Sequence, residues 1–234
     1  MAGHGRVIGW LMRVRQEPAA MVTLIVVAAG IWSFGKLAEA VTAGSTESFD
    51  ERVVLALRNP SDLADPIGPP WVEEMLRDFT ALGGVAVLTG LTLAASIWLG
   101  LEGERHLAIV LLVAVLGGLL TSSLLKLQYE RPRPQLVPHG SYVYSHSFPS
   151  GHAMMSAATY LTLAVMIARS RRRKSVRVFV LLFALLLTVL VGLSRVYLGV
   201  HWPTDVLAGW IGGAVWALTV WYVAGYWRPT EKSP

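Results

Sequence analysis

The 234-residue sequence contains no cysteine. This absence excludes disulfides, thiol catalysis and metal sites built from cysteine. Charged residues are also scarce, because Asp, Glu, Lys and Arg together make up 15% of the chain, whereas soluble domains usually contain about 25%. Hydrophobic residues make up 54%. We therefore expect an integral membrane protein folded as one domain over residues 1–234.

Six apolar segments are each long enough, at roughly 20 residues, to cross a bilayer as a helix. They cover about residues 19–38, 80–101, 106–127, 151–168, 176–194 and 204–226. The predicted fold class is all-α, with six transmembrane helices. Gly209, Gly212 and Gly213 in the last segment favour close approach of a neighbouring helix.

Residues 41–79 are the longest stretch outside these segments. Residues 49–58 and 71–79 are amphipathic, and prolines separate them. We expect two short helices lying on the outer face of the membrane, which we name the outer arm. A lid over the site and a simple connector are both compatible with this pattern.

Positive charges cluster in a loop between apolar segments, and this location argues against nucleic acid as a partner. The net charge is +5, but a large part of it lies in one short run between two apolar segments, from Arg169 to Arg177. Such a run is typical of a cytoplasmic loop. Residues 1–18, with Arg6, Arg13 and Arg15, are then cytoplasmic as well, and six spans place both termini inside. We interpret the first span as an uncleaved anchor, although residues 38–40 resemble a signal-peptide cleavage site.

Three polar clusters remain, and this topology places all of them on the outer side. They cover residues 126–134, 149–152 and 194–205. Asp205 is the only aspartate after Asp78. Because polar groups at membrane depth are costly, a functional site is the first interpretation of these clusters.

The second and third clusters contain the residue types of a phosphate site. Ser150 is a suitable N-cap, and the Gly151 backbone and His152 lie in the first turn of a helix, where anions bind well. Taken alone, this is also the pattern of a plain capped helix. His201 and Asp205 lie four residues apart, a spacing that brings the carboxylate onto the imidazole. The alternative for the third cluster is an interfacial arginine and histidine beside an aromatic belt of Tyr197 and Trp202.

The first cluster supplies Lys126 and Arg133, while Arg195 adds a third cation able to grip phosphate oxygens. Arg131 is interpreted as a side chain that only reaches toward the membrane surface. The remaining outer histidines and tyrosines are expected to be loop residues or contacts at the substrate rim: His139, Tyr142, Tyr144 and His146. No metal site is predicted, because carboxylates are few in these clusters.

Together the clusters form a tripartite pattern. In order they read Lys126-x6-Arg133-Pro134, then Pro149-Ser150-Gly151-His152, then Ser194-Arg195-x5-His201-x3-Asp205. The chain resembles the type 2 phosphatidic acid phosphatase superfamily, the lipid phosphate phosphatases, whose signature has these three parts. The resemblance extends from about residue 46 through the sixth span. Within the superfamily, the chain resembles the bacterial members in particular.

This resemblance implies a mechanism without a metal or other cofactor. His201 would attack phosphorus and form a phosphohistidine, and Asp205 would orient it. His152 would protonate the leaving lipid oxygen and then activate water. The phosphate oxygens would be held by Lys126, Arg133, Ser150, Gly151 and Arg195.

The resemblance also implies a lipid phosphate as substrate, in a bacterial inner membrane. Candidates include undecaprenyl pyrophosphate, phosphatidic acid and phosphatidylglycerophosphate. Three alternatives remain: a lipid phosphotransferase with the same phosphohistidine, a non-catalytic lipid-phosphate-binding protein, and the vanadium haloperoxidases, which have the same signature but are soluble. The sequence indicates no oligomeric state.

Overall fold

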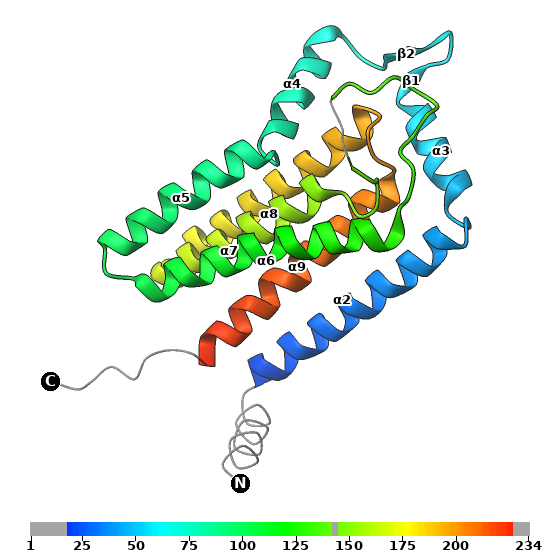
Figure 1. Ribbon diagram of the computed structural model, residues 1–234. Coiled ribbons are helices and arrows are strands. Elements are labelled where there is room, and N and C mark those ends of the chain that lie inside the picture. Colours follow the sequence, from blue (N-terminus) through cyan, green and yellow to red (C-terminus); the bar gives the residue numbers. More distant parts are fainter. Residues whose placement is uncertain (1–17, 142–144, 227–234) are drawn as a thin grey trace, which may run out of the picture.

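Figure 1 shows the computed structural model, which describes residues 18–141 and 145–226. Long helices run side by side, and short elements lie across one end of them (Figure 1). The elements, in order, are α2 (Pro18–Thr42), α3 (Glu47–Ala56), β1 (Arg58–Asn59), β2 (Asp62–Pro66), α4 (Pro70–Ala81), α5 (Val85–Leu101), α6 (Arg105–Tyr129), α7 (Gly151–Ser170), α8 (Lys174–Tyr197) and α9 (Pro203–Tyr226). The all-α prediction is confirmed. The N-terminal arginines and two loop tyrosines, Tyr142 and Tyr144, lie outside the described residues.

Five of these helices are long and apolar enough to cross a membrane: α2, α6, α7, α8 and α9. The pair α4 and α5 forms the sixth candidate span, although a bend of 46° separates the two helices. The described residues thus contain five candidate spans, or six if the bent pair is counted as one broken span, against the six predicted.

The break lies at Gly83 and Gly84, where the sequence had predicted one uninterrupted span from residue 80. The backbone of Gly84 is extended, and α5 begins only at Val85. With 17 residues, α5 has a length of about 26 Å, somewhat less than the apolar thickness of a bilayer. A β-carbon on Gly83 would lie 2.4 Å from a Val191 methyl and 3.2 Å from the His152 carbonyl oxygen. The small residue thus lets the bend approach α7 and α8.

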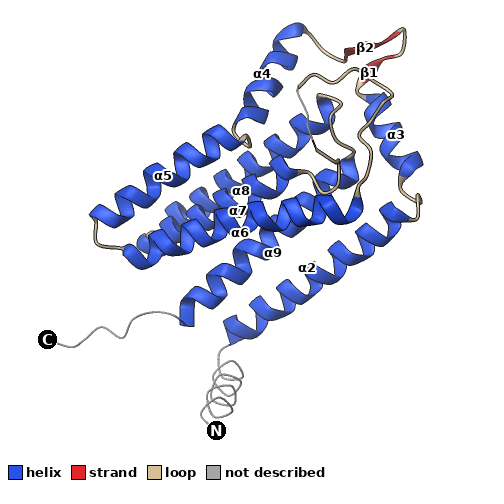
Figure 2. Ribbon diagram, in the orientation of Figure 1, coloured by secondary structure: helices blue, strands red, loops and turns tan. Residues whose placement is uncertain are grey.

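The predicted outer arm contains its two helices, α3 and α4, and also a small hairpin that the sequence did not predict. Strands β1 and β2 pair antiparallel, as Figure 2 shows in red. Two bonds join this region to the end of α8: the Arg58 guanidinium donates to the Tyr197 carbonyl (2.8 Å), and the Tyr197 hydroxyl donates to the Ile67 carbonyl (2.8 Å). The arm is therefore attached to the bundle by buried and half-buried polar contacts.

Helix α7 lies at the centre of the bundle and packs against α6, α8 and α9. Most of its side chains are buried, and many of them are small. On α9, a β-carbon at Gly209 would lie 2.7 Å from the Ser150 carbonyl oxygen, and one at Gly213 would lie 2.3 Å from the Met154 carbonyl oxygen. The predicted close approach is thus confirmed at Gly209 and Gly213, whereas Gly212 has ordinary contact distances.

The two ends of the bundle differ in character. One end holds α3, the hairpin, α4 and the connections before α7 and α9 (Figure 1). We name it the signature end, because all three clusters lie there. The opposite end holds the α5–α6 and α7–α8 connections, and the latter contains the arginine-rich run.

Candidate active site

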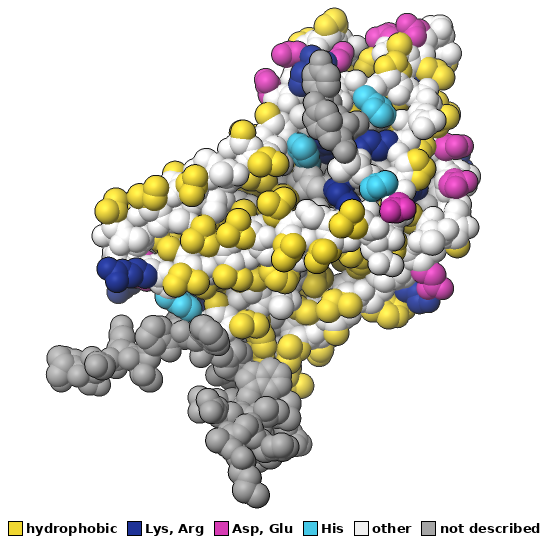
Figure 3. Space-filling model, in the orientation of Figure 1, with side chains coloured by type: hydrophobic (Ala, Val, Ile, Leu, Met, Phe, Trp, Pro, Cys, Tyr) yellow, Lys and Arg dark blue, Asp and Glu magenta, His cyan; other side chains and the backbone are white. Residues whose placement is uncertain are grey.

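A cavity of about 560 Å³ lies at the signature end, between α5, α6 and α7. Its polar part is lined by six of the predicted site residues: Lys126, Arg133, Gly151, His152, Arg195 and His201. Its other walls are apolar and include Leu88 on α5, Leu116 and Leu119 on α6, and Met155 on α7. Leu116 and Leu119 are also exposed on the outside of the bundle. In Figure 3, hydrophobic side chains cover the flank of the bundle, and basic and histidine side chains gather near the signature end.

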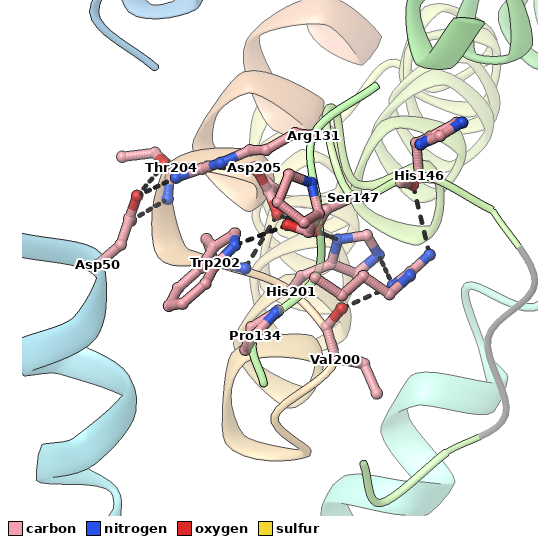
Figure 4. A network of polar contacts seen from close by, with 12 residues as sticks. Asp50, Arg131, Pro134, His146, Ser147, Val200, His201, Trp202, Thr204 and Asp205 are labelled. Atoms are coloured by element: carbon pink, nitrogen blue, oxygen red, sulfur yellow. Dashed lines mark hydrogen bonds and ion pairs between the residues drawn. The ribbon is translucent and has the colours of Figure 1, made fainter. Parts of the chain in front are cut away.

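His201 lies in the connection between α8 and α9 and is only 1% exposed. Its Nε2 atom lies 3.1 Å from Arg133 Nη1. Its Nδ1 atom lies 3.3 Å from Ser147 Oγ and 3.4 Å from Asp205 Oδ2 (Figure 4). A guanidinium only donates, so Nε2 must be the acceptor and Nδ1 must carry the proton. The lone pair of Nε2 is then directed to the side of the ring where the cavity cations lie.

The surroundings of His201 keep the imidazole neutral. Burial and, after it, the nearby cations Arg133, Arg195 and Lys126 hold the pKa of His201 well below its usual value of 6.5, with the smallest contribution from His152. The contact with Asp205 is therefore a hydrogen bond from a neutral ring. A nucleophile requires a neutral, oriented imidazole, and here the Nε2 lone pair is met by Arg133.

Asp205 lies behind His201, in the first turn of α9, and is fully buried. Its Oδ2 atom accepts hydrogen bonds from the Ser147 hydroxyl and from the Trp202 backbone N–H (3.0 Å). Its Oδ1 atom accepts one from Arg131 Nη1 (2.6 Å). The position of the carboxylate is thus determined from several sides.

Arg131 does not merely reach toward the membrane surface, and that interpretation was wrong. Its side chain is 10% exposed and forms ion pairs with both Asp205 and Asp50. The guanidinium also lies over the ring of Trp202, 5.6 Å from its centroid. Trp202 in turn donates its indole N–H to the Pro132 carbonyl (3.0 Å). The arginine is a half-buried part of the site because two carboxylates from α3 and α9 meet it.

The loop of the first two clusters is tied to the cavity by cationic side chains. Arg133 donates to the carbonyls of Val200 (2.6 Å) and Ser145 (2.8 Å) as well as contacting His201. Lys126, in the last turn of α6, donates to the His146 carbonyl (2.5 Å). Of the two histidines expected at the substrate rim or in the loop, His146 lines the cavity. His139 does not line it and instead contacts the Pro134 carbonyl (2.7 Å).

Three buried polar atoms at this end have no hydrogen-bond partner among the described residues, and two of them belong to predicted site residues: Arg195 Nε and Ser150 Oγ. Arg195 is 2% exposed, and its Nη1 donates to Thr80 Oγ1 (2.9 Å). Ser150 is the N-cap of α7 as predicted, but its hydroxyl makes no capping bond, and it does not line the cavity. Its backbone N–H donates to the Asp205 carbonyl (2.9 Å), which joins the starts of α7 and α9.

Two residues of this site, Asp50 and Ser147, were missed by the sequence analysis. Asp50 had a detectable signal: it lies four residues before Val54, and both are buried on one face of α3. A carboxylate on the apolar face of an amphipathic helix needs a partner. Ser147 gave no comparable signal, because its neighbours fall into no helical or strand pattern.

Comparison with known proteins agrees with the pattern of the site. Residues 107–229 match the PAP2 superfamily. Phosphatidylglycerophosphatase B of Bacillus subtilis is 36% identical over 182 residues, which cover 74% of this chain and 82% of that protein. The putative undecaprenyl-diphosphatase YbjG of Escherichia coli is 30% identical over 171 residues, which cover 70% of this chain and 80% of that protein.

The fold has a solved counterpart as well. The crystal structure of the first transmembrane PAP2 type phosphatidylglycerolphosphate phosphatase from Bacillus subtilis superposes with a TM-score of 0.78 at 28% identity. The superposition covers 88% of this chain and 98% of that one. From the family match, the extent of the identity and the shared fold, we conclude that this chain is a multi-pass membrane protein belonging to the PAP2 superfamily of phosphatases.

Proposed function

We propose that the protein hydrolyses a phosphate or pyrophosphate monoester of a membrane lipid through a phosphohistidine on His201. One observation carries this proposal: a single cavity joins a cluster of cations and histidines to apolar walls on α5, α6 and α7. A lipid phosphate has the matching shape, with a charged head and an apolar tail. Leu116 and Leu119 are exposed on the flank of the bundle, which supports access of the tail from the side.

In the first step, the lone pair of His201 Nε2 attacks the terminal phosphorus, and the bond from this phosphorus to the oxygen that stays with the lipid product breaks. His152, in its protonated form, donates a proton to that oxygen. In the second step, water attacks the phosphohistidine, His152 takes the proton from the water, and phosphate leaves with His201 restored. Arg133 Nη1 contacts the Nε2 lone pair at 3.1 Å in the free protein. When phosphate binds, Arg133 must exchange this contact for one with a phosphate oxygen, so that the lone pair can reach phosphorus.

The phosphate oxygens are held by Lys126, Arg133, Arg195, Ser150 and the backbone N–H of Gly151. Two observations support this assignment. Arg195 lines the cavity and its Nε atom is buried without a partner in the described part of the chain, whereas buried polar atoms usually have one. Gly151 begins α7, so its N–H is one of the free donors of a helix N-terminus. Loss of one such oxyanion contact costs on the order of 100-fold or more in rate.

The relatives support two substrate types for this site. One is named as a phosphatidylglycerophosphatase and one as a putative undecaprenyl-diphosphatase. Both names describe a phosphate or diphosphate on a lipid carrier. We therefore propose phosphatidylglycerophosphate or undecaprenyl pyrophosphate as the substrate, with phosphatidic acid as a third candidate.

The test is phosphate release by the purified protein in detergent with EDTA present, using each of these three lipids. We expect release by the wild type, loss in His201→Ala, and normal release in His106→Ala, whose histidine lies in the first turn of α6 at the opposite end of the bundle. Release that stops in EDTA would contradict the metal-free mechanism. Release retained by His201→Ala would show that another residue is the nucleophile. Transfer of the phosphoryl group to a second lipid, without free phosphate, would identify a phosphotransferase.

We also propose that the signature end faces the outside of the cell membrane, with both termini in the cytoplasm. The arginine-rich α7–α8 connection at the opposite end supports this orientation. Because the chain has no cysteine, single cysteines label without background. An impermeant maleimide added to intact cells should label Pro138→Cys and not Arg172→Cys, and the reverse result would invert the topology.

A further inference from the structure

The strongest unassigned feature of the molecule is a buried ion network on the side of Asp205 that faces away from His201 (Figure 4). Arg131 lies in this network between two carboxylates, each with a fully buried side chain. Its Nη2 atom donates to Asp50 Oδ2 at 2.7 Å, and its Nη1 atom donates to Asp205 Oδ1 at 2.6 Å. Asp50 belongs to α3, so the network connects the outer arm to the carboxylate beside His201.

Asp50 is bonded to the start of α9 as well as to Arg131. Its Oδ1 atom accepts from the Thr204 backbone N–H (3.0 Å), and its Oδ2 atom accepts from the Thr204 hydroxyl (2.6 Å). The N–H of Thr204 lies at a helix N-terminus and has no acceptor within the helix, and a carboxylate is favourable at this position. Asp50 therefore holds the same helical turn that carries Asp205.

The network determines which oxygen of Asp205 faces His201. Oδ1 is occupied by Arg131, while Oδ2 is left to the Ser147 hydroxyl, the Trp202 N–H and His201 Nδ1. Without the bridge, Asp205 Oδ1 would lose its donor and the carboxylate would lose its only cationic partner among the described ion pairs. The bonds to Oδ2 would then have to hold the carboxylate alone, and the acceptor that orients the His201 proton would be less firmly placed.

We propose that Asp50 and Arg131 are positioning residues for the reaction, which together hold Asp205 in the orientation that keeps the Nε2 lone pair of His201 directed at phosphorus. The role of His201 in this statement rests on the proposed function. The bridge lies beside a second cavity of about 450 Å³, lined by Asp50, Arg131 and Trp202 among others, and the two residues do not line the substrate cavity. They act through Asp205 and not on the substrate.

The charges make a prediction that a purely structural role does not make. Asp50, Arg131 and Asp205 together carry a net charge of −1, since two carboxylates surround one guanidinium. Asp50→Asn changes this net charge to 0 and should lower the pKa of His201, whereas Arg131→Gln changes it to −2 and should raise it. In the double variant the net charge is −1 again, so the pKa of His201 should return toward the wild-type value while the bridge stays broken.

Apart from Asp50, Arg131 and Asp205, four titratable groups act on His201, and they are the same in all of these variants. They are Lys126 on α6, Arg133 in the loop between α6 and α7, His152 on α7 and Arg195 on α8. Differences between the variants therefore report the bridge.

The experiment measures phosphate release and the titration of His201 in the same set of proteins. Protein labelled with ¹⁵N-histidine in detergent micelles gives the His201 signal, which is assigned by its loss in His201→Ala. We expect Asp50→Asn and Arg131→Gln each to reduce kcat by about 10- to 100-fold, the range found for residues that orient the ligands of catalytic metals, with KM little changed. The His201 pKa should move in opposite directions in the two variants. Arg131→Lys keeps the positive charge but loses the two guanidinium donors that bridge Asp50 and Asp205. Its His201 pKa should therefore be closer to the wild-type value than its kcat is.

Glu51→Gln is the matched control, because Glu51 is an exposed carboxylate on the same helix and adjacent to Asp50. Its kcat and its His201 titration should equal those of the wild type. Two results would overturn the proposal: an unchanged kcat in both single variants, or pKa shifts of the same sign in both. If the wild type itself releases no phosphate, the proposed function fails, and the opposite pKa shifts still decide whether the bridge controls His201.

Discussion

Replacing Ser147 with alanine removes one hydroxyl that lies between the imidazole of His201 and the carboxylate of Asp205. Ser147 is fully buried, and its Oγ donates to Asp205 Oδ2 while lying 3.3 Å from His201 Nδ1. The substitution keeps the backbone N–H, which donates to the Arg131 carbonyl (2.8 Å), so the loop should keep its position. The change is thus confined to one donor of the carboxylate.

The expected size of the effect follows from the type of bond. A hydrogen bond to a charged group contributes about 1.5–3 kcal/mol. If all of this stabilised the transition state, kcat would fall by about 10- to 150-fold, since each 1.36 kcal/mol is a factor of ten. Asp205 Oδ2 keeps the Trp202 N–H at 3.0 Å, and Oδ1 keeps Arg131, so we expect a loss near the lower value. KM should stay unchanged because Ser147 does not line the cavity.

The assay is the steady-state rate of phosphate release from the preferred lipid, with kcat and KM measured separately. Ser156→Ala is the control, because Ser156 is also fully buried and its hydroxyl donates only to the Ala153 carbonyl (3.0 Å) within α7. It should reproduce any general loss of stability without the loss of kcat. The reasoning is refuted if Ser147→Ala has the kcat of the wild type, or if the control loses as much.

Two further predictions concern the pH dependence and the apolar wall. Burial and neighbouring cations hold the pKa of His201 well below 6.5, so the imidazole should stay neutral as the pH falls through 6.5. The decrease of kcat/KM at acid pH that is caused by protonation of His201 should therefore lie below pH 6.5. A His201 titration at or above pH 6.5 by ¹⁵N NMR would contradict this. Leu119→Trp places a large ring in the cavity wall and should raise KM for a long-chain lipid more than for a short-chain, soluble phosphate ester. Its control is Leu120→Trp, an exposed neighbour that does not line the cavity, and equal effects of the two would argue against tail binding at this wall.

The outer arm illustrates how far a hydrophobic pattern leads. Amphipathic periodicity predicted two short helices in residues 41–79, and α3 and α4 are present. The pattern did not predict the β1–β2 hairpin, because a strand of two residues paired with one of five leaves no periodic signal. The pattern also did not place the break before α5, since Gly83 and Gly84 are compatible with both a continuous apolar helix and a bend. The packing of Gly83 against His152 and Val191 selects the bend.

The sequence by itself determined the properties that depend on composition and on short spacings. Apolar segments of bilayer length determined an all-α membrane fold, and the order of the three clusters determined the family. The contact between His201 and Asp205 was also predictable, because the two residues lie only four positions apart.

Only the tertiary structure decided what surrounds Asp205. Its partner Ser147 lies 58 residues away in sequence, Arg131 lies 74 away, and Asp50 reaches Thr204 across 154 residues. A lone arginine near the membrane surface has the same sequence pattern whether it extends to water or pairs with a carboxylate. The choice for Arg131 was made by the packing of α3 against α9, which places a second buried carboxylate within hydrogen-bond distance and makes the pair with Asp205 part of a buried network.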